Sequence, residues 1–314
     1  MALISILILS HNRQEDLKRN LTQLLSVPTE NVYEFIVVDN ASTDGTPMML
    51  KEMSTEFCNL RVFLNKRNLG VAEGRNVGLR EARGEYIISL DDDSEIQMKD
   101  VEKVPLLFEE NPEAGIIAFK ICHAKTGELQ NDHGFESCKV ANHHGAGAAF
   151  RRDIFDQVGY IDEGCSFGSE EIDICIRART VGYSVVYIPD VLVLHNNFRR
   201  ENVVDKKRRE LRVYNNSRIM HKYFPSSMAL IFSLRYLTSQ LLSVVKDYGL
   251  LSSFSLVLAA KNGRKDGRRM RVKIDLGTIK YYSQATCRPD YGNVPITTKL
   301  FRKIDFIPFF GRGR

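Results

Sequence analysis

The chain alternates short aliphatic runs with segments of helical periodicity, and this alternation restricts the fold more than any other feature. The aliphatic runs end at polar or turn-forming residues and lie at 3–9, 35–38, 60–64, 86–90, 115–121 and 184–188. Apolar residues at helical spacing lie at 14–25, 46–56, 72–82, 99–110 and 170–180. Continuous aliphatic runs are typical of strands buried on both faces. The rhythm predicts an α/β protein with a mixed, mainly parallel sheet and helices on both faces.

Polar and acidic residues follow three of these strands at the point where each strand ends. They are Ser10, Asn12 and Arg13 after the first strand, Asp39 and Asn40 after the second, and Asp91, Asp92 and Asp93 after the fourth. In parallel α/β sheets, ligands bind beyond the carboxyl ends of the strands. We therefore expect these side chains on one rim of the sheet.

The three consecutive aspartates are the sharpest of these features. Adjacent carboxylates repel one another, which raises their pKa values unless a cation or hydrogen-bond donors compensate. Mg²⁺ and Mn²⁺ favour oxygen ligands and are commonly shared between carboxylates and substrate phosphates. A charge run also marks water-facing segments, so a solvated acidic loop is the alternative. The position directly after a buried strand favours a Mg²⁺ or Mn²⁺ site.

Two further segments are candidates for nucleotide binding. The Asp39 carboxylate can accept a hydrogen bond from a base N–H or a ribose hydroxyl, although the surrounding DNASTDG is also a good turn and helix N-cap sequence. Asn68 and Gly70 precede and open a glycine-containing helix, in which the Arg75 guanidinium is a candidate diphosphate partner. This segment lacks the G-x-G-x-x-G pattern of dinucleotide folds, which disfavours a NAD enzyme.

Acidic residues crowd the start of helix 170–180, and a histidine follows the last aliphatic run. The helix dipole favours negative charge there, which is a sufficient structural reason for Glu170 and Glu171. Alternatively, one of them is a general base, since a carboxylate within hydrogen-bond reach can deprotonate a hydroxyl. His195 is either an ordinary core or surface histidine, or a Mn²⁺ ligand beside carboxylates.

Five segments within residues 1–200 resemble, in order and spacing, family 2 glycosyltransferases of the GT-A fold. They are ILSHNR, VVDNASTDGT, NLGVAEGRNVGLREARGEYIISLDDD, FRRDIFDQVGYIDE and EEIDICIRARTVGYSVVYIPDVLVLH. The resemblance implies an inverting enzyme that moves a sugar from a nucleotide-sugar donor to an acceptor hydroxyl in one in-line displacement.

The resemblance also implies residue roles. Asp39 would hold the nucleobase and Asp92 would approach the ribose. Asp93, with Asp91 in some members, would bind Mg²⁺ or Mn²⁺ on the diphosphate, and His195 would complete the metal site. The other residues expected at the nucleotide are Ser10, Asn12, Arg13, Asn40, Asn68, Gly70 and Arg75. The family often has Glu-Asp where this chain has Glu170-Glu171, so Glu171 is the expected base and Glu170 the reserve.

Charge divides the chain into two parts. Residues 1–198 contain 19 Lys and Arg against 31 Asp and Glu, whereas residues 199–314 contain 25 against 8. We expect a nucleotide-sugar-binding catalytic domain at 1–205 and a basic, mainly helical region at 206–314.

The charge distribution also bears on the binding partners. The acidic front half argues against nucleic acid. The basic region either docks on an anionic membrane surface or forms a helical cap or oligomer contact. Charges interrupt its apolar stretch at 228–260, so a clean membrane-spanning helix is not expected.

The predicted function is a metal-dependent glycosyltransferase using a UDP- or dTDP-sugar and a glycan or lipid-linked acceptor. Widely spaced cysteines and an N-terminus without a secretory leader indicate a cytoplasmic location, with peripheral attachment to the inner face of the membrane as an option. A nucleotidyltransferase and a non-catalytic sugar-nucleotide- or glycan-binding module are the alternatives. No Gly-rich nucleotidyl signature lies near the first strand, and Glu171 with the three aspartates disfavours a binding module.

Overall fold

The computed structural model describes residues 3–27, 32–131, 133–134, 136–196, 203–248 and 253–284. The chain forms two compact units, Met1–Arg199 and Arg200–Arg314. The division falls before helix α8, and the predicted boundary at 205/206 lies inside that helix. The part of the predicted C-terminal region beyond residue 284 lies outside the described residues. That the first part is the catalytic domain and the second part contacts a membrane or another subunit stays a prediction.

A mixed sheet forms the centre of the first unit, with the strand order β3-β2-β1-β4-β8-β6-β9-β5 and β7 paired to β9. Its strands are β1 (Ile4–Ser10), β2 (Val32–Asp39), β3 (Leu60–Leu64), β4 (Tyr86–Asp91), β5 (Ser94–Ile96), β6 (Ala114–His123), β7 (Cys138–Lys139), β8 (Gly147–Arg151) and β9 (Ser184–His195). Neighbours among β1 to β4 are parallel, as are β6 and β9, whereas β8 runs antiparallel between β4 and β6. The predicted mixed, mainly parallel sheet is confirmed.

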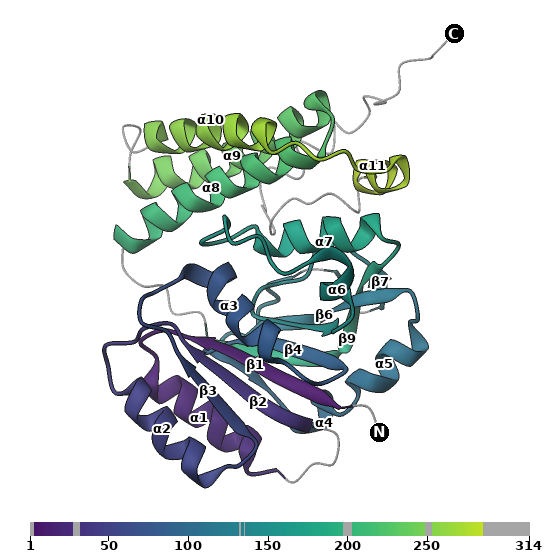
Figure 1. Cartoon of the computed structure of the whole chain (residues 1–314). Helices are drawn as coiled ribbons and strands as arrows, with labels where there is room; N and C mark the ends of the chain where they lie inside the picture. Colours follow the sequence, from purple (N-terminus) through teal and green to yellow (C-terminus); the bar gives the residue numbers. More distant parts are fainter. Residues whose placement is uncertain are drawn as a thin grey trace. The chain divides into compact units, whose positions relative to one another are not determined.

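Helices cover both faces of this sheet (Figure 1). They are α1 (Gln14–Leu25), α2 (Thr46–Glu56), α3 (Gly70–Glu81), α4 (Met98–Val101), α5 (Val104–Glu110), α6 (Ile154–Val158) and α7 (Glu170–Thr180). One core joins alternate residues of β1 to apolar residues of α1, α2, α4 and α5. Figure 1 shows α3, α6 and α7 on the opposite face.

Two glycines bring α3 close to the sheet. A Cβ added at Gly74 would lie 2.8 Å from Leu9 Cδ1, and one added at Gly78 would overlap Leu7 Cδ1. Side chains at these two positions would push the helix outward. The close approach holds the second turn of α3, and Arg75 with it, near the ends of β1 and β4.

Some elements differ from the sequence predictions. The helix expected at 99–110 is divided into α4 and α5, with Pro105 in the first turn of α5, because proline has no N–H for an interior helical bond. The expected strand at 184–188 and the following aliphatic run form the single strand β9, with a register shift against β6 between Phe119 and Lys120. Strand β8 was not predicted.

The sheet brings the carboxyl ends of several strands to one rim. Ser10 pairs with Asp39 across β1 and β2, and Leu9 pairs with Asp91 across β1 and β4. Because β8 is antiparallel to both β4 and β6, strands β6 and β9 run in the same direction as β4. His195, the last residue of β9, therefore ends at the same rim.

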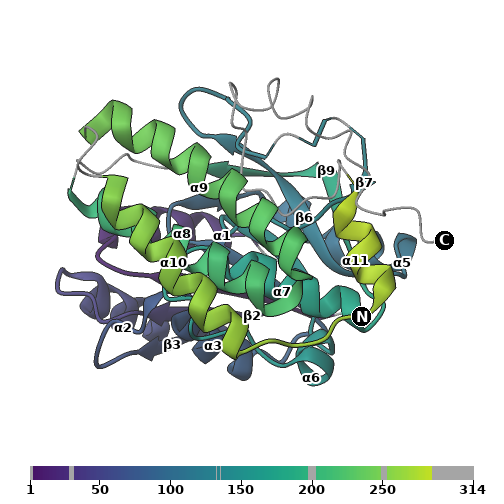
Figure 2. The same ribbon diagram turned by 90° about the horizontal axis from the view of Figure 1, so that it is seen from above.

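The second unit contains four described helices: α8 (Val203–Tyr223), α9 (Ser226–Tyr248), α10 (Phe254–Arg269) and α11 (Leu276–Ser283). The expected C-terminal helical region is thus present. Helices α8, α9 and α10 pack together (Figure 2), and Val213, Leu237, Val244 and Leu256 lie in their shared core.

One described helix passes a length and composition test for crossing a membrane. The stretch Ser226–Val245 of α9 has 20 residues and a mean hydropathy of 1.4, and 39% of the tested window is buried within the structure. Core helices of soluble proteins pass the same test, so this result alone does not assign α9 to a membrane.

Candidate active site

Two aspartates and a histidine meet at the rim of the sheet. Asp91, Asp93 and His195 each offer a ligand atom, and these atoms lie within 4.8 Å of one another. His195 Nε2 lies 3.2 Å from Asp93 Oδ1, and its Nδ1 lies 2.6 Å from Gln130 Oε1, which holds the ring in place. Two carboxylates and an imidazole are suitable ligands for a divalent cation such as Mn²⁺.

The local charges shift the pKa values of this cluster. Burial raises the pKa of Asp91, and it also raises that of Asp92 to about 7 with help from the neighbouring charges of Asp93 and Asp91. Burial lowers the pKa of His195, but the hydrogen bond and charge of Asp93 outweigh it, so the net shift is upward. Burial and mutual repulsion thus disfavour the charged forms of Asp91 and Asp92, and a bound cation would favour them.

The β1 loop contacts the same aspartates. The Ser10 hydroxyl and the His11 backbone N–H donate to Asp92 Oδ2 at 3.0 and 3.1 Å. Arg13 Nη2 lies 3.2 Å from Asp93 Oδ2. The Asn12 side chain points to the loop that follows β2, where its oxygen accepts a hydrogen bond from the Thr43 N–H at 2.7 Å. Ser10 therefore contacts Asp92 and Arg13 contacts Asp93, whereas Asn12 contacts the loop that follows β2.

Asp39 is buried at the end of β2 with half of its carboxylate unused. Its Oδ2 accepts from the Ser42 N–H at 3.1 Å. Among the described residues, its Oδ1 has no hydrogen-bond partner although it is buried. Such an acceptor is costly to bury, and a ligand N–H or O–H would satisfy it.

The Asn40 side chain organises the loop before α3. It donates to Asn68 Oδ1 and to the Gly70 carbonyl, and it accepts from the Leu69 N–H at 2.9 Å. Gly70 has φ +81°, and a Cβ there would meet the Ser166 carbonyl at 2.8 Å, so glycine is required. In this structure Asn40, Asn68 and Gly70 therefore shape the loop chiefly through contacts with one another.

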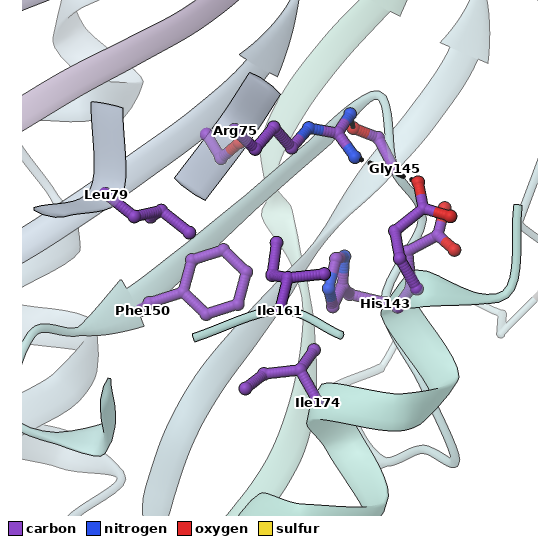
Figure 3. A pocket seen from close by; sticks show the side chains of 10 residues that line it. Arg75, Leu79, His143, Gly145, Phe150, Ile161 and Ile174 are labelled. Atoms are coloured by element: carbon purple, nitrogen blue, oxygen red, sulfur yellow. Dashed lines mark hydrogen bonds and ion pairs between the residues drawn. The ribbon is translucent and has the colours of Figure 1, made fainter. Parts of the chain in front are cut away.

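Arg75 links the aspartate cluster to the start of α7. Arg75 is 4% exposed, and its guanidinium donates to Asp91 Oδ1 and to Glu170 Oε1 at 3.2 Å. It also donates to the Gly145 carbonyl at 2.8 Å (Figure 3). These internal partners occupy both of its terminal nitrogens. Arg75 is expected at a diphosphate, but in the structure it makes three contacts within the protein. These contacts connect Asp91, a predicted metal ligand, with Glu170, the predicted reserve base.

Glu170 and Glu171 begin α7 beside a small cavity. Burial, followed by the charge of Glu171, raises the pKa of Glu170 despite the opposing effect of Arg75. Gly145 allows the approach of Glu171, because an added Cβ would lie 2.6 Å from Glu171 Oε1. The cavity beside them holds about 10 Å³ and is lined by Ser89, His143, Phe150, Ile161 and Ile174 among others (Figure 3), which is space for about one water molecule.

The predicted residues therefore lie in one unit, at the rim of the sheet, in the loop before α3 and at the start of α7, and Arg75 contacts both the rim and α7. Sequence reasoning missed two of their neighbours. Gln130 fixes the His195 ring, and buried His143 lines the cavity with no described partner for its Nε2. Both lie in the irregular segment before β8, where no periodicity pointed to them.

Comparison with known proteins identifies the family. The sequence model described as glycosyl transferase family 2 matches residues 5–173. An uncharacterised glycosyltransferase of Haemophilus influenzae is 34% identical over 115 residues, which are 37% of this chain and 37% of that protein. The dTDP-rhamnosyl transferase RfbF of Shigella flexneri is 26% identical over 195 residues, 56% of this chain and 64% of that protein. The matches span less than two thirds of either relative.

The fold agrees with a solved glycosyltransferase structure. The mannosyltransferase PcManGT from Pyrobaculum calidifontis, in complex with GDP-Man and Mn²⁺, superposes with a TM-score of 0.57 at 18% identity, covering 85% of this chain and 83% of that one. That likeness concerns the fold. Because the family model matches more than half of the chain, the protein belongs to glycosyl transferase family 2 and has the GT-A fold.

Proposed function

We propose that this glycosyltransferase is metal-dependent and inverting, and that it transfers a sugar from a UDP- or dTDP-sugar to a hydroxyl of a glycan or lipid-linked acceptor. The observation that carries the proposal is the joining of two sites through Arg75. Its guanidinium contacts Asp91 of the cation-ligand cluster and Glu170 at the start of α7. This arrangement suits a reaction in which a diphosphate leaves on one side of a sugar and a base acts on the other.

The donor's base and ribose would lie against the ends of β1 and β2. The buried Asp39 Oδ1 without a described partner suits the N3–H of uracil or thymine. Asp92, held by Ser10 and His11, would accept from a ribose hydroxyl. Asn12, Arg13, Asn40, Asn68 and Gly70 would shape the nucleotide site. RfbF is named a dTDP-rhamnosyl transferase, which agrees with a pyrimidine nucleotide.

Asp91, Asp93 and His195 would hold the cation, and the mixed oxygen and nitrogen ligands favour Mn²⁺ over Mg²⁺. The PcManGT complex contains Mn²⁺ with its sugar nucleotide. When bound, a divalent ion supplies stabilisation of the negative charge that develops on the departing diphosphate. Arg13, beside Asp93, would keep that carboxylate oriented.

Glu171 would act as the general base, with Glu170 as the reserve. The acceptor oxygen attacks the anomeric carbon, its proton passes to a Glu171 oxygen, and the bond to the phosphate oxygen breaks with its electron pair leaving on the nucleoside diphosphate. The Arg75 contact at Glu170 Oε1 supports this division of roles, because that oxygen already accepts a hydrogen bond from the guanidinium and is less available to an acceptor hydroxyl.

Nucleoside-diphosphate release from a panel of sugar nucleotides tests the proposal. We expect release with Mn²⁺, its loss with EDTA, and recovery when Mn²⁺ is restored. Glu171→Gln should lower transfer by about 100-fold or more while donor affinity stays nearly unchanged. Turnover in EDTA would overturn the metal dependence, and full activity of Glu171→Gln would overturn the base assignment. Binding without turnover for every donor and acceptor would favour a binding module.

A further inference from the structure

Helix α10 is fixed in rotation by a pair of glycines. An added Cβ at Gly263 would overlap the Tyr214 carbonyl of α8, and one at Gly267 would overlap the Arg218 carbonyl. Only glycine allows two backbones to approach this closely. Since Gly263, Gly267 and Leu256 define the buried side of α10, the opposite side of the helix faces outward.

The first turns of that outward side are apolar. Phe254, Val257 and Leu258 are 68%, 48% and 57% exposed, and their spacing of three and four residues places them on one face. Single exposed apolar residues are ordinary, but a contiguous exposed group marks an interaction surface more often.

The last turns of the same side are basic. Lys261, Lys265 and Arg268 continue the face at helical spacing and are exposed. None of the three makes an ion pair with another described residue, whereas the adjacent Arg269 lies 3.9 Å from Asp266. Helix α9 adds an apolar outward stripe of Ile231, Leu234, Leu242 and Val245, each at least 41% exposed.

We propose that the outward face of α10 docks on the surface of an anionic lipid bilayer. Phe254, Val257 and Leu258 would enter the boundary between headgroups and acyl chains, and Lys261, Lys265 and Arg268 would contact lipid phosphates. One helical face thus carries apolar residues suited to the acyl-chain boundary and cations suited to the lipid phosphates. This proposal rests on the proposed function, because a lipid-linked acceptor would give the docking its purpose. The residues that support it all lie in the second unit.

The absence of tryptophan from the chain allows a clean reporter. The Phe254→Trp chain is mixed with vesicles of phosphatidylcholine alone or with added phosphatidylglycerol at physiological ionic strength. We expect its emission maximum to move to shorter wavelength only with the anionic vesicles. The matched control is Met48→Trp, at an exposed apolar position of α2, and its emission should not move. An unshifted Phe254→Trp spectrum would overturn the proposal.

Flotation of the full chain with the same vesicles tests the charges. Each removed cation should lower the partition coefficient by about fivefold, so Lys261→Gln/Lys265→Gln/Arg268→Gln should lower it by about 100-fold. Lys18→Gln/Lys51→Gln/Lys99→Gln changes the net charge equally at exposed lysines of the first unit and should have little effect. Equal flotation of the two triple variants would contradict the proposal.

Nucleoside-diphosphate release without vesicles separates this inference from the proposed function. Release by a chain that does not float would overturn only the docking surface, whereas flotation without release would overturn only the proposed reaction. Concentration-dependent dimerisation in place of flotation, lost in Phe254→Ser/Leu258→Ser, would assign the face to a second copy and overturn the membrane proposal.

Discussion

At the scale of single residues, the site combines carboxylates of raised pKa with unused buried acceptors. Asp91, Asp92 and Asp93 lie within a few residues of the end of β4, and the pKa of Asp92 rises to about 7. Asp39 Oδ1 and Glu170 Oε2 are buried without described hydrogen-bond partners. These groups cost folding free energy in the ligand-free chain. Binding of cation and donor would recover that free energy, which couples ligand binding to stability.

Replacement of Asp39 tests its role at the nucleobase. In Asp39→Asn the amide oxygen can still accept from the Ser42 N–H, which leaves an NH₂ group facing the ligand donor. We expect the Kd for UDP to rise by about 10- to 100-fold, as for a lost hydrogen bond to a charged group. Isothermal titration calorimetry measures this. Asp44→Asn, at an exposed acid of the same loop, is the control, and similar Kd values for both variants would refute the assignment.

The raised pKa of Glu170 predicts a pH effect on stability. In the folded chain this carboxyl keeps its proton above its ordinary pKa, because burial and then Glu171 disfavour the charged form. The unfolded chain has already lost that proton, so the free energy of unfolding falls as pH rises from the ordinary to the raised pKa. In Glu170→Gln this contribution is absent. Urea unfolding from about pH 5 to about pH 8 should give a shallower decline for the variant, and equal declines would contradict the expectation.

Individual residue types were easier to predict than their partners. The aspartates after β4 and the glutamates at the start of α7 are visible because each group is contiguous in the sequence. Arg75 was expected at a diphosphate, yet it contacts Asp91, Glu170 and the Gly145 carbonyl, which lie 16, 95 and 70 positions away. No local pattern reports contacts over such separations, and the same holds for Gln130 beside His195.

At the scale of elements, close packing by glycine recurs in both units. Gly74 and Gly78 bring α3 onto β1, and Gly263 and Gly267 bring α10 onto α8. The neighbour differs in the two cases. Leucine side chains face the glycines of α3 and can shift, whereas backbone carbonyls face those of α10 and cannot. The α10 contact should therefore tolerate an added methyl group less well.

Gly267→Ala tests that contact. The added methyl group would overlap the Arg218 carbonyl, so we expect a loss of about 1–3 kcal/mol of stability, partly offset by the better helix propensity of alanine. Asn262→Ala, at an exposed position of the same helix, should be neutral or slightly stabilising. Hydrogen exchange of α8 and α10 amides in the full chain reports the difference. Unchanged protection in Gly267→Ala would show that the helices adjust freely.

Elements with strong periodicity were predicted well, and those held by tertiary context were not. The aliphatic runs predicted β1, β3 and β4 to within a residue or so. Strands β1 and β4 are buried on both faces, whereas β3 is a partly exposed edge strand. Strand β8 has the sequence GAAFR, which has too little aliphatic character to stand out. It becomes a strand because β4 and β6 pair with it on both sides, a constraint that the local sequence does not express.

At the scale of the whole molecule, charge divides between the two units. The first unit contains the acidic rim, the cation-ligand cluster and the proposed base. The second contains the outward face of α10 with its apolar and basic halves. The proposed reaction on a lipid-linked acceptor needs recognition of a nucleotide and residence at a membrane surface. The charge distribution along the sequence agrees with a separation of these two proposed tasks.

The proposed reaction depends most on the capacity of Asp91, Asp93 and His195 to bind a divalent cation together with a nucleotide. Electron paramagnetic resonance of free Mn²⁺ measures this directly, because bound Mn²⁺ loses the sharp six-line signal. Titration of the wild-type chain with UDP present should remove Mn²⁺ from the free pool in proportion to the chain. Asp93→Asn should not do so, whereas Glu95→Gln, at an acid paired with Arg19, should behave as wild type. Equal Mn²⁺ uptake by Asp93→Asn and the wild-type chain would contradict the proposed cation site.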